Sequence, residues 1–327
     1  MLHRRNFLAG SGLGLTLGSL PWPALGQEPG FPARPLHFIV PLTPGGSADL
    51  LARLVGQHLS QRWSQPVVVE MKPGGGTVIG SNVVAKAPAD GYTLLFAANS
   101  LVINAKLRNN LPYDGLKAFE PVACMALSPQ VLAVNPASPH QTLDAFLAAA
   151  RAHPGTLSLG SLGPATTQHM AVEALQRETD VHLIYVPYAG GAPAVNAVLG
   201  GHVDAVLANL AEVSAHIEAG TLRPLAVTTQ ERLPSLRQVP TVAESGHPGF
   251  EALAWFGVAV PTGTPSAVVE QLAAGVKSAL ADPLLREQLV SHGLQPAYLG
   301  PRDFARYIAR SYDSYSHLID AAGITAG

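Results

Sequence analysis

The sequence of 327 residues contains a single cysteine, Cys124. One cysteine excludes an internal disulfide and any metal site built from several thiolates. Cys124 lies in the apolar stretch FEPVACMALSPQVLAVNP, which predicts a buried strand, so we expect its thiol to be an inert core group. No cofactor is expected, since no cofactor motif is complete anywhere in the chain.

Charge is also scarce: 13% of the residues are Asp, Glu, Lys or Arg, and the formal net charge is −2. A nucleic-acid-binding surface or a basic membrane patch needs concentrated positive charge, and both are therefore excluded. With 47% hydrophobic residues, 32 glycines and 28 prolines, the chain is too apolar for disorder and rich in turns. Its length predicts two domains, and the lack of a long exposed apolar stripe favours a monomer.

Nucleotide and catalytic motifs are incomplete. Gly75 and Gly80 have the spacing of a P-loop, but Ser81 follows where a lysine is needed. No HExxH or GxSxG sequence occurs. One alternative is an exported hydrolase that uses His169 or Cys124, which would require a nucleophile and a base in one cleft.

The N-terminus has the layout of an export signal. MLHRRNFLAGSGLGLTLGSLPWPALGQ combines a charged start, an apolar centre and a small-residue end. Arg4 and Arg5, followed by Asn-Phe-Leu, resemble a twin-arginine signal. We therefore expect residues 1–26 to be removed near Gly26 and Gln27, leaving a mature periplasmic protein without a later membrane span.

Strands and helices alternate after the signal. The patterns predict β-α-β-α-β over residues 36–98 and a second alternation over 142–229, both typical of parallel sheets with right-handed crossovers. Two extended segments, 120–135 and 250–262, connect the blocks. The prediction is a lobe of residues 27–127 plus 255–327, a second lobe of 128–254, and a cleft between them that closes by a hinge.

Glycine-rich corners follow several predicted strands. Pro44-Gly45-Gly46-Ser47, the run 74–77, the segment 161–167 and the turn 188–191 each lead into a predicted helix. Helix N-termini present free N–H groups and the positive end of the helix dipole, and glycine allows a ligand to approach the backbone. Four such corners favour an anion site over four ordinary turns. Asp49, in the first turn of its helix, is expected to bond free amides there.

The same segments resemble a known family. IVPLTPGGSADLLARLV, QPVVVEMKPGGGTVIGSNVVAKAPADGYTLLF and VPYAGGAPAVNAVLGGHVDAVLAN are similar, in this order, to segments of the substrate-binding components of tripartite tricarboxylate transporters, the Bug family. LPYDGLKAFEPVACMALSPQVLAVNP and GTLRPLAVTTQERLPSLRQVPTVAESG extend the resemblance over nearly all of the mature chain. The resemblance also implies substrate contacts at Asn99, which follows a predicted strand.

The resemblance implies an α/β, two-lobed periplasmic binding protein of type II-like architecture, each lobe a mainly parallel sheet flanked by helices. Its ligand would be a small organic acid, such as a di- or tricarboxylate, an amino acid or an aromatic acid, and its partner the membrane components of the transporter. A sensory module for a membrane signalling partner is a further alternative. The expected ligand-binding residues are Pro44, Gly45, Gly46, Ser47, Gly76, Thr77, Asn99, Ser161, Thr166, Thr167, Tyr188, Gly190 and Asn209.

Overall fold

The computed structural model describes residues 30–163 and 166–325. The predicted export signal, residues 1–26, lies outside these described residues. Within the described chain, no helix is both long enough and apolar enough to cross a membrane.

The first α/β block follows the predicted alternation. Its strands are β1 (Leu36–Val40), β2 (Val67–Met71) and β3 (Thr93–Ala98), and its helices are α1 (Ser47–Trp63), α2 (Val78–Ala85) and α3 (Ser100–Leu107). β1 lies between β2 and β3 and is parallel to both, with Phe38 beside Val69 on one side and Leu94 on the other. Because the strands are parallel, their carboxyl ends and the loops that follow them lie at one edge.

A second parallel group has the same design. β5 (Ser158–Leu162) lies between β6 (Ile184–Tyr188) and β7 (Ala205–Asn209) and is parallel to both. The helices of this part are α4 (Leu143–Ala152), α5 (Thr167–Thr179), α6 (Gly191–Leu199) and α7 (Leu210–Glu218), and β8 spans Arg223–Val227. The long aliphatic side chains of β7 are fully buried, since helices pack on the sheet.

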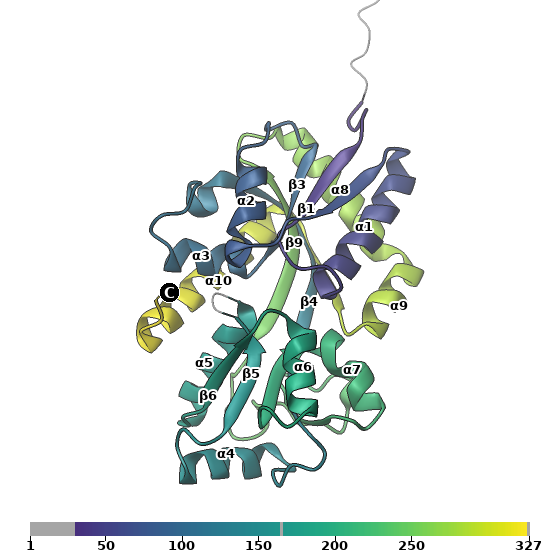
Figure 1. Ribbon diagram of the computed structural model, residues 1–327. Helices are drawn as coiled ribbons and strands as arrows, with labels where there is room; N and C mark the ends of the chain where they lie inside the picture. The colour runs from purple at the N-terminus through teal and green to yellow at the C-terminus, as the bar shows by residue number, and fades with distance from the viewer. Residues whose placement is uncertain (1–29, 164–165, 326–327) are drawn as a thin grey trace, which may run out of the picture. The chain divides into compact units, whose positions relative to one another are not determined.

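Two long strands join the groups. β4 (Phe119–Val134) and β9 (Leu253–Pro261) pair antiparallel, from Phe119 beside Pro261 to Pro129 beside Leu253. β9 also pairs with β3, and the end of β4 pairs with β7 and β8, so the sheet order is β2-β1-β3-β9-β4-β7-β5-β6. In Figure 1, β4 and β9 run from the β1–β3 group to the β5–β6 group.

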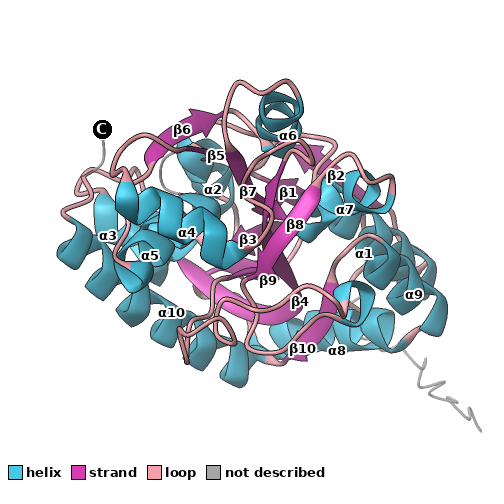
Figure 2. Cartoon of the chain, turned by 90° about the horizontal axis from the view of Figure 1, so that it is seen from below, coloured by secondary structure: helices cyan, strands magenta, loops and turns pink. Residues whose placement is uncertain are grey.

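The C-terminal part returns to the first block. α8 (Ser266–Ala281), α9 (Pro283–Ser291), β10 (Gln295–Leu299) and α10 (Pro301–Ala322) complete the chain, and β10 pairs with β4. The Asp282 side chain caps α9, and Pro283 occupies its first position, which separates α9 from α8. Figure 2 shows helices on both sides of the strands.

The buried apolar side chains form separate clusters. One cluster joins β1, α3, β9 and α10 around Trp255 and Phe304, which pack edge to face with ring centroids 5.4 Å apart. Another, around Phe146, joins α4 and α5 to β4, β5 and β7, and a third, around Val195 and Val213, joins α6 and α7 to β4 and β7. Cys124 belongs to the first cluster and is fully buried, as expected, and burial raises the pKa of its thiol to about 12.

The sequence patterns predicted the ends of most helices and strands to within two residues, but they missed some elements. α3 and β10 are additional elements, and the predicted C-terminal helical tail is divided into α8, α9 and α10. The two connecting segments are not simple linkers: as β4 and β9 they form an antiparallel ladder inside the sheet. Continuous apolar runs such as VACMALS do not reveal strand direction, which depends on pairing partners far away in the sequence.

One glycine of this ladder should be irreplaceable. A Cβ atom on Gly257 of β9 would lie 2.3 Å from the Phe304 ring and 2.7 Å from the Ala123 carbonyl oxygen of β4. We expect Gly257→Ala to lower the free energy of unfolding by about 2 kcal/mol or more, because both neighbours are buried. Gly56→Ala in α1 is the control, since its Cβ would lie 3.4 Å from Val67 and should leave stability unchanged or slightly higher. Urea unfolding of both variants tests this, and equal midpoints would contradict it.

Candidate functional site

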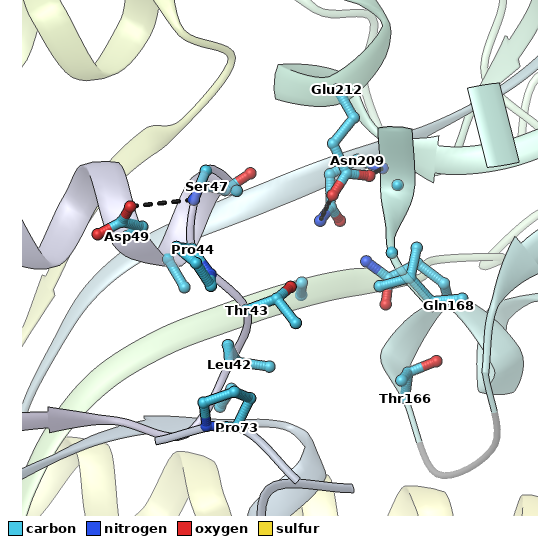
Figure 3. A pocket seen from close by; sticks show the side chains of 18 of the residues that line it. Leu42, Thr43, Pro44, Ser47, Asp49, Pro73, Thr166, Gln168, Asn209 and Glu212 are labelled. Carbon is cyan, nitrogen blue, oxygen red and sulfur yellow. Dashed lines mark hydrogen bonds between the residues drawn. The ribbon is translucent and has the colours of Figure 1, made fainter. Parts of the chain in front are cut away.

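A pocket of about 880 Å³ lies at the carboxyl ends of the parallel strands, within the size range of small-molecule sites. The loops after β1, β2, β3, β5, β6 and β7 all contribute to its lining, together with Ala254 and Phe256 of β9. Figure 3 shows Thr43, Pro44 and Ser47 on one side, and Gln168 and Asn209 on the other. The two parallel groups therefore line one pocket from both sides.

Two helices of the first block begin at this pocket. α1 starts at Ser47 and α2 at Val78, and among the described residues no side chain caps either of them. The first two N–H groups of α2 are bonded to the carbonyl oxygens of Gly75 and Gly74, so the free N–H groups on this side belong to the start of α1. The hydroxyl oxygen of Ser47 is buried and finds no hydrogen-bond partner among the described residues, although Ser47 lines the pocket. These groups and the positive ends of two helix dipoles make this side of the pocket suited to an anion.

The first glycine loop is held by its own helix. The Gly45 N–H donates to Asp49 Oδ2 at 3.0 Å, and Arg53 Nε donates to Asp49 Oδ1 at 2.6 Å. Gly45 has φ +84°, which favours glycine. Asp49 therefore bonds a free amide, as expected. Its carboxylate also forms an ion pair with Arg53, which lines the pocket.

The second glycine loop has an unusual backbone. Gly74, Gly75, Gly76 and Thr77 all have positive φ, and Thr77, a β-branched residue at φ 82°, is strained in this conformation. Asn104 of α3 supports the turn, because its Nδ2 donates to the Gly76 carbonyl oxygen at 2.6 Å and also lies 3.3 Å from Thr77 Oγ1. Strain kept in place by buried neighbours is typical of ligand-binding loops.

Thr77 Oγ1 in turn donates to Ser100 Oγ at 3.1 Å. Ser100 begins α3 and also lines the pocket, so side chains link the segments that follow β2 and β3. These contacts fix the loops before any ligand arrives, which lowers the entropy cost of binding.

The opposite side of the pocket comes from β5, β6 and β7. Thr166 caps α5, accepting from the His169 N–H at 3.2 Å and donating to the Gly163 carbonyl oxygen at 2.8 Å. Thr167 and Gln168 follow in the first turn and are almost fully buried. Tyr188 and Gly190 form the corner that leads into α6.

Glu212 lies where α6 and α7 begin. Its Oε2 accepts from the N–H of Asn209, the residue before the first turn of α7, at 3.0 Å. A Cβ atom on Gly191, the first residue of α6, would lie 2.1 Å from Glu212 Cδ, so glycine makes room for the carboxyl group. Burial raises the pKa of Glu212 to about 7, although the hydrogen bond from Asn209 acts in the opposite direction.

Most of the predicted ligand-binding residues lie together in this pocket. Those that line it are Pro44, Gly45, Gly46, Ser47, Gly76, Thr77, Thr166, Thr167, Tyr188, Gly190 and Asn209. Asn99 and Ser161 are not in the lining. Asn99 accepts from the Trp255 N–H and donates to Tyr315 Oη, whereas Ser161 donates to the Leu207 carbonyl oxygen. Both side chains join strands or helices instead of facing the pocket.

The side chains considered for hydrolase chemistry lie elsewhere. His169 stacks on Tyr185 with ring centroids 4.6 Å apart, and burial lowers its pKa. Neither His169 nor Cys124 is among the residues that line the pocket.

Several residues that line the pocket are not among the predicted ligand-binding residues. Arg53 and Gln168 are inside helices, Phe256 is in a strand, and His292 follows α9 far away in the sequence. The position of Glu212 at a helix start could have been predicted from the sequence, since Asn209 and Glu212 have the spacing of a helix capping box directly after a strand.

The buried carboxyl group gives stability a pH dependence. Between pH 4.5 and 7, folded Glu212 keeps a proton that the unfolded chain releases, so its contribution to stability falls as the pH rises, and the loss is complete above pH 7. Glu212→Gln keeps an acceptor for the Asn209 N–H but cannot ionise. From pH 5 to pH 8, we expect the wild type to lose up to about 3 kcal/mol of unfolding free energy relative to this variant.

Urea unfolding at both pH values measures this difference. Glu218→Gln, on the exposed last turn of α7, is the matched control and should follow the wild type. A constant difference between wild type and Glu212→Gln over this range would show that Glu212 is ionised throughout.

Comparisons with known proteins agree with this geometry. Residues 51–324 match the family model described as "Tripartite tricarboxylate transporter family receptor". The protein BugT of Bordetella pertussis is 35% identical over 295 residues, which are 90% of this chain and 90% of BugT. A solved structure described as a periplasmic transporter has a TM-score of 0.84 at 37% identity, covering 90% of this chain and 99% of that chain.

Two further similar structures contain ligands. Rpa4515 of R. palustris with adipate has a TM-score of 0.84 at 33% identity, covering 90% of this chain and 99% of that one. MatC of Rhodopseudomonas palustris with bound malate has a TM-score of 0.79 at 28% identity, covering 88% and 100%. The expected α/β periplasmic binding protein fold is therefore confirmed. The chain belongs to the tripartite tricarboxylate transporter receptor family, a family of periplasmic solute-binding transport receptors and not of enzymes.

Proposed function

We propose that this protein binds a small carboxylate in the pocket and delivers it to the membrane components of a tripartite tricarboxylate-type transporter. The observation that carries this proposal is the uncapped start of α1, with the unpartnered Ser47 hydroxyl, at a pocket where α2 also begins. A carboxylate placed there would receive main-chain N–H groups and the Ser47 hydroxyl without needing a charged partner. The adipate and malate bound by two relatives are ligands of this chemical class.

Ligand capture would use closure of two lobes. We propose residues 27–127 with 255–327 as one lobe and 128–254 as the other, with β4 and β9 as the two segments that pass between them. Ser47 comes from the first range and Asn209 from the second, so a ligand that touches both stabilises the closed arrangement by its higher affinity for it. A monomer is sufficient for this mechanism.

Delivery to a membrane transporter requires export. We propose that residues 1–26 act as a twin-arginine type signal and that the mature chain begins near Gln27. The family's periplasmic location and the Arg4-Arg5 pair followed by an apolar segment support this proposal.

Ligand binding can be tested by thermal stability of protein that has been unfolded and refolded to remove retained ligand. A ligand specific for the native state raises the melting temperature in proportion to its affinity and concentration. We expect C4–C6 mono- and dicarboxylates to include stabilising ligands, and their uncharged amides to have no effect. Failure of every carboxylate in a broad panel to raise the melting temperature would contradict the proposal.

The role of the α1 start can be separated from general effects with two serine variants. Ser47→Ala removes the unpartnered hydroxyl and should weaken binding of a stabilising carboxylate about tenfold, since a hydrogen bond to a charged group contributes roughly 1.5–3 kcal/mol. Ser266→Ala is the matched control, because Ser266 is also the first residue of an uncapped helix, α8, but is exposed and outside the pocket lining. Calorimetric titration of both variants measures the effect, and equal losses would argue against a specific role for Ser47.

A further inference from the structure

The two sides of the pocket differ in electrostatic character. On the side of α1 and α2, the start of α1 has no side-chain cap and the Ser47 hydroxyl has no partner among the described residues. On the side of α6 and α7 lies a carboxyl group of the protein itself, because Glu212 accepts from the Asn209 N–H before α7 and lies beside Gly191, the first residue of α6. A ligand that meets donors at one end therefore meets an acceptor at the other.

Glu212 has capacity left for a ligand. Its Oε2 accepts from the Asn209 N–H, and its Oε1 has only a long contact of 3.5 Å with Asn209 Nδ2. Within the described part of the chain, Glu212 forms no ion pair with a lysine, arginine or histidine. A carboxylate can accept about four hydrogen bonds, so the cap of α7 uses a fraction of its capacity.

Asn209 adds a second acceptor at the same place. Its Oδ1 is buried and has no donor within hydrogen-bonding distance among the described residues, and the whole residue is only 5% exposed. Its orientation toward the first turn of α7 is that of a capping box, but the contact is longer than a hydrogen bond. Asn209 and Glu212 both line the pocket (Figure 3).

A purely structural role explains part of this arrangement. The cap accounts for Oε2 of Glu212, as in many helices that do not bind ligands. It does not account for the remaining acceptor capacity of Glu212 and Asn209 inside a pocket, where unsatisfied polar groups are unfavourable. Above pH 7, where Glu212 is ionised, a second carboxylate of the cargo would make this worse, since two like charges would meet in a partly desolvated place.

We infer that the cargo is a carboxylate that also carries a hydrogen-bond donor, such as an amino, hydroxyl or amide group, and that Glu212 and Asn209 bind this donor. The carboxylate lies at the start of α1, on the side where α2 also begins, and the donor lies toward α6 and α7. This inference rests on the proposed function, because it assigns the second end of the same ligand. It predicts that the protein prefers such acids to plain dicarboxylates of the same length.

A length-matched series of acids tests the preference. The probes are 6-aminohexanoate, 6-hydroxyhexanoate, hexanoate and adipate, together with the corresponding four-carbon series. They are titrated by calorimetry at pH 8 into refolded protein. We expect the amino or hydroxy acid of at least one length to bind tenfold or more tightly than the monocarboxylate and the dicarboxylate of that length.

Two variants assign the preference to the named residues. Glu212→Gln should remove most of the advantage of the amino acid and improve binding of the dicarboxylate, while Glu218→Gln should change neither. Asn209→Ser keeps a helix-capping side chain and removes Oδ1, so it gives a second measurement if the Glu212 variant does not fold.

The outcomes separate this inference from the proposed function. Equal or tighter binding of the dicarboxylate, or a preference for donors that survives in Glu212→Gln and Asn209→Ser, would overturn the inference and leave carboxylate binding in place. Absence of binding by every acid of both series and of a wider carboxylate panel would overturn both.

Discussion

The antiparallel pairing of β4 with β9 is the constraint on which the rest of the structure depends. β4 is 16 residues long, and it pairs with β9 along one part and with β7 and β8 along another. Both parallel groups are therefore attached to the same ladder. Asn99, at the end of β3, strengthens this attachment because its amide bonds the Trp255 N–H and the Leu253 carbonyl oxygen of β9. Six strand ends meet at one pocket as a result.

The proposed anion site has little positive charge among its described lining residues. Arg53 is the lining arginine, and its Nε is bonded to Asp49. Most other polar groups of the lining are main-chain amides, hydroxyls and the side chains of Gln168, Asn209 and Glu212, which are neutral or acidic. Fixed dipoles discriminate by geometry, whereas a flexible cation would attract any anion of the right size. The strained Thr77 turn, supported by Asn104 and Ser100, is consistent with this reliance on direction.

Much of the fold could be read from the sequence because the local signals agree with each other. The helix predicted after the Pro44-Gly45-Gly46-Ser47 corner is α1, which begins at Ser47, since glycines precede it and its apolar residues recur at helical spacing. The glycine corners predicted a shared site because parallel strands place their carboxyl ends together. Two alternating blocks joined by two extended segments predicted two lobes, and the order of the family's segments agreed with that prediction.

The parts that could not be predicted depend on contacts between distant residues. Asn99 and Ser161 have the right residue type and position for ligand contacts, yet their side chains bond to β9, α10 and β7. Nothing in the sequence distinguishes a strand-end amide that faces a pocket from one that joins two strands. His292 is the opposite case, a residue that lines the pocket without any sequence pattern that predicts it. It lies there because the turn at Gly293 packs against the start of α7.

The burial of Cys124 has a practical consequence for chemical labelling. The chain has one thiol, it is fully buried in the ladder, and its pKa is raised to about 12, so it exists as a protonated, shielded group at neutral pH. Thiol-reactive dyes need an accessible thiolate, and the native protein offers none. A cysteine introduced on the rim of the pocket would therefore react alone, and a fluorophore attached there would report cargo capture without background from the natural thiol.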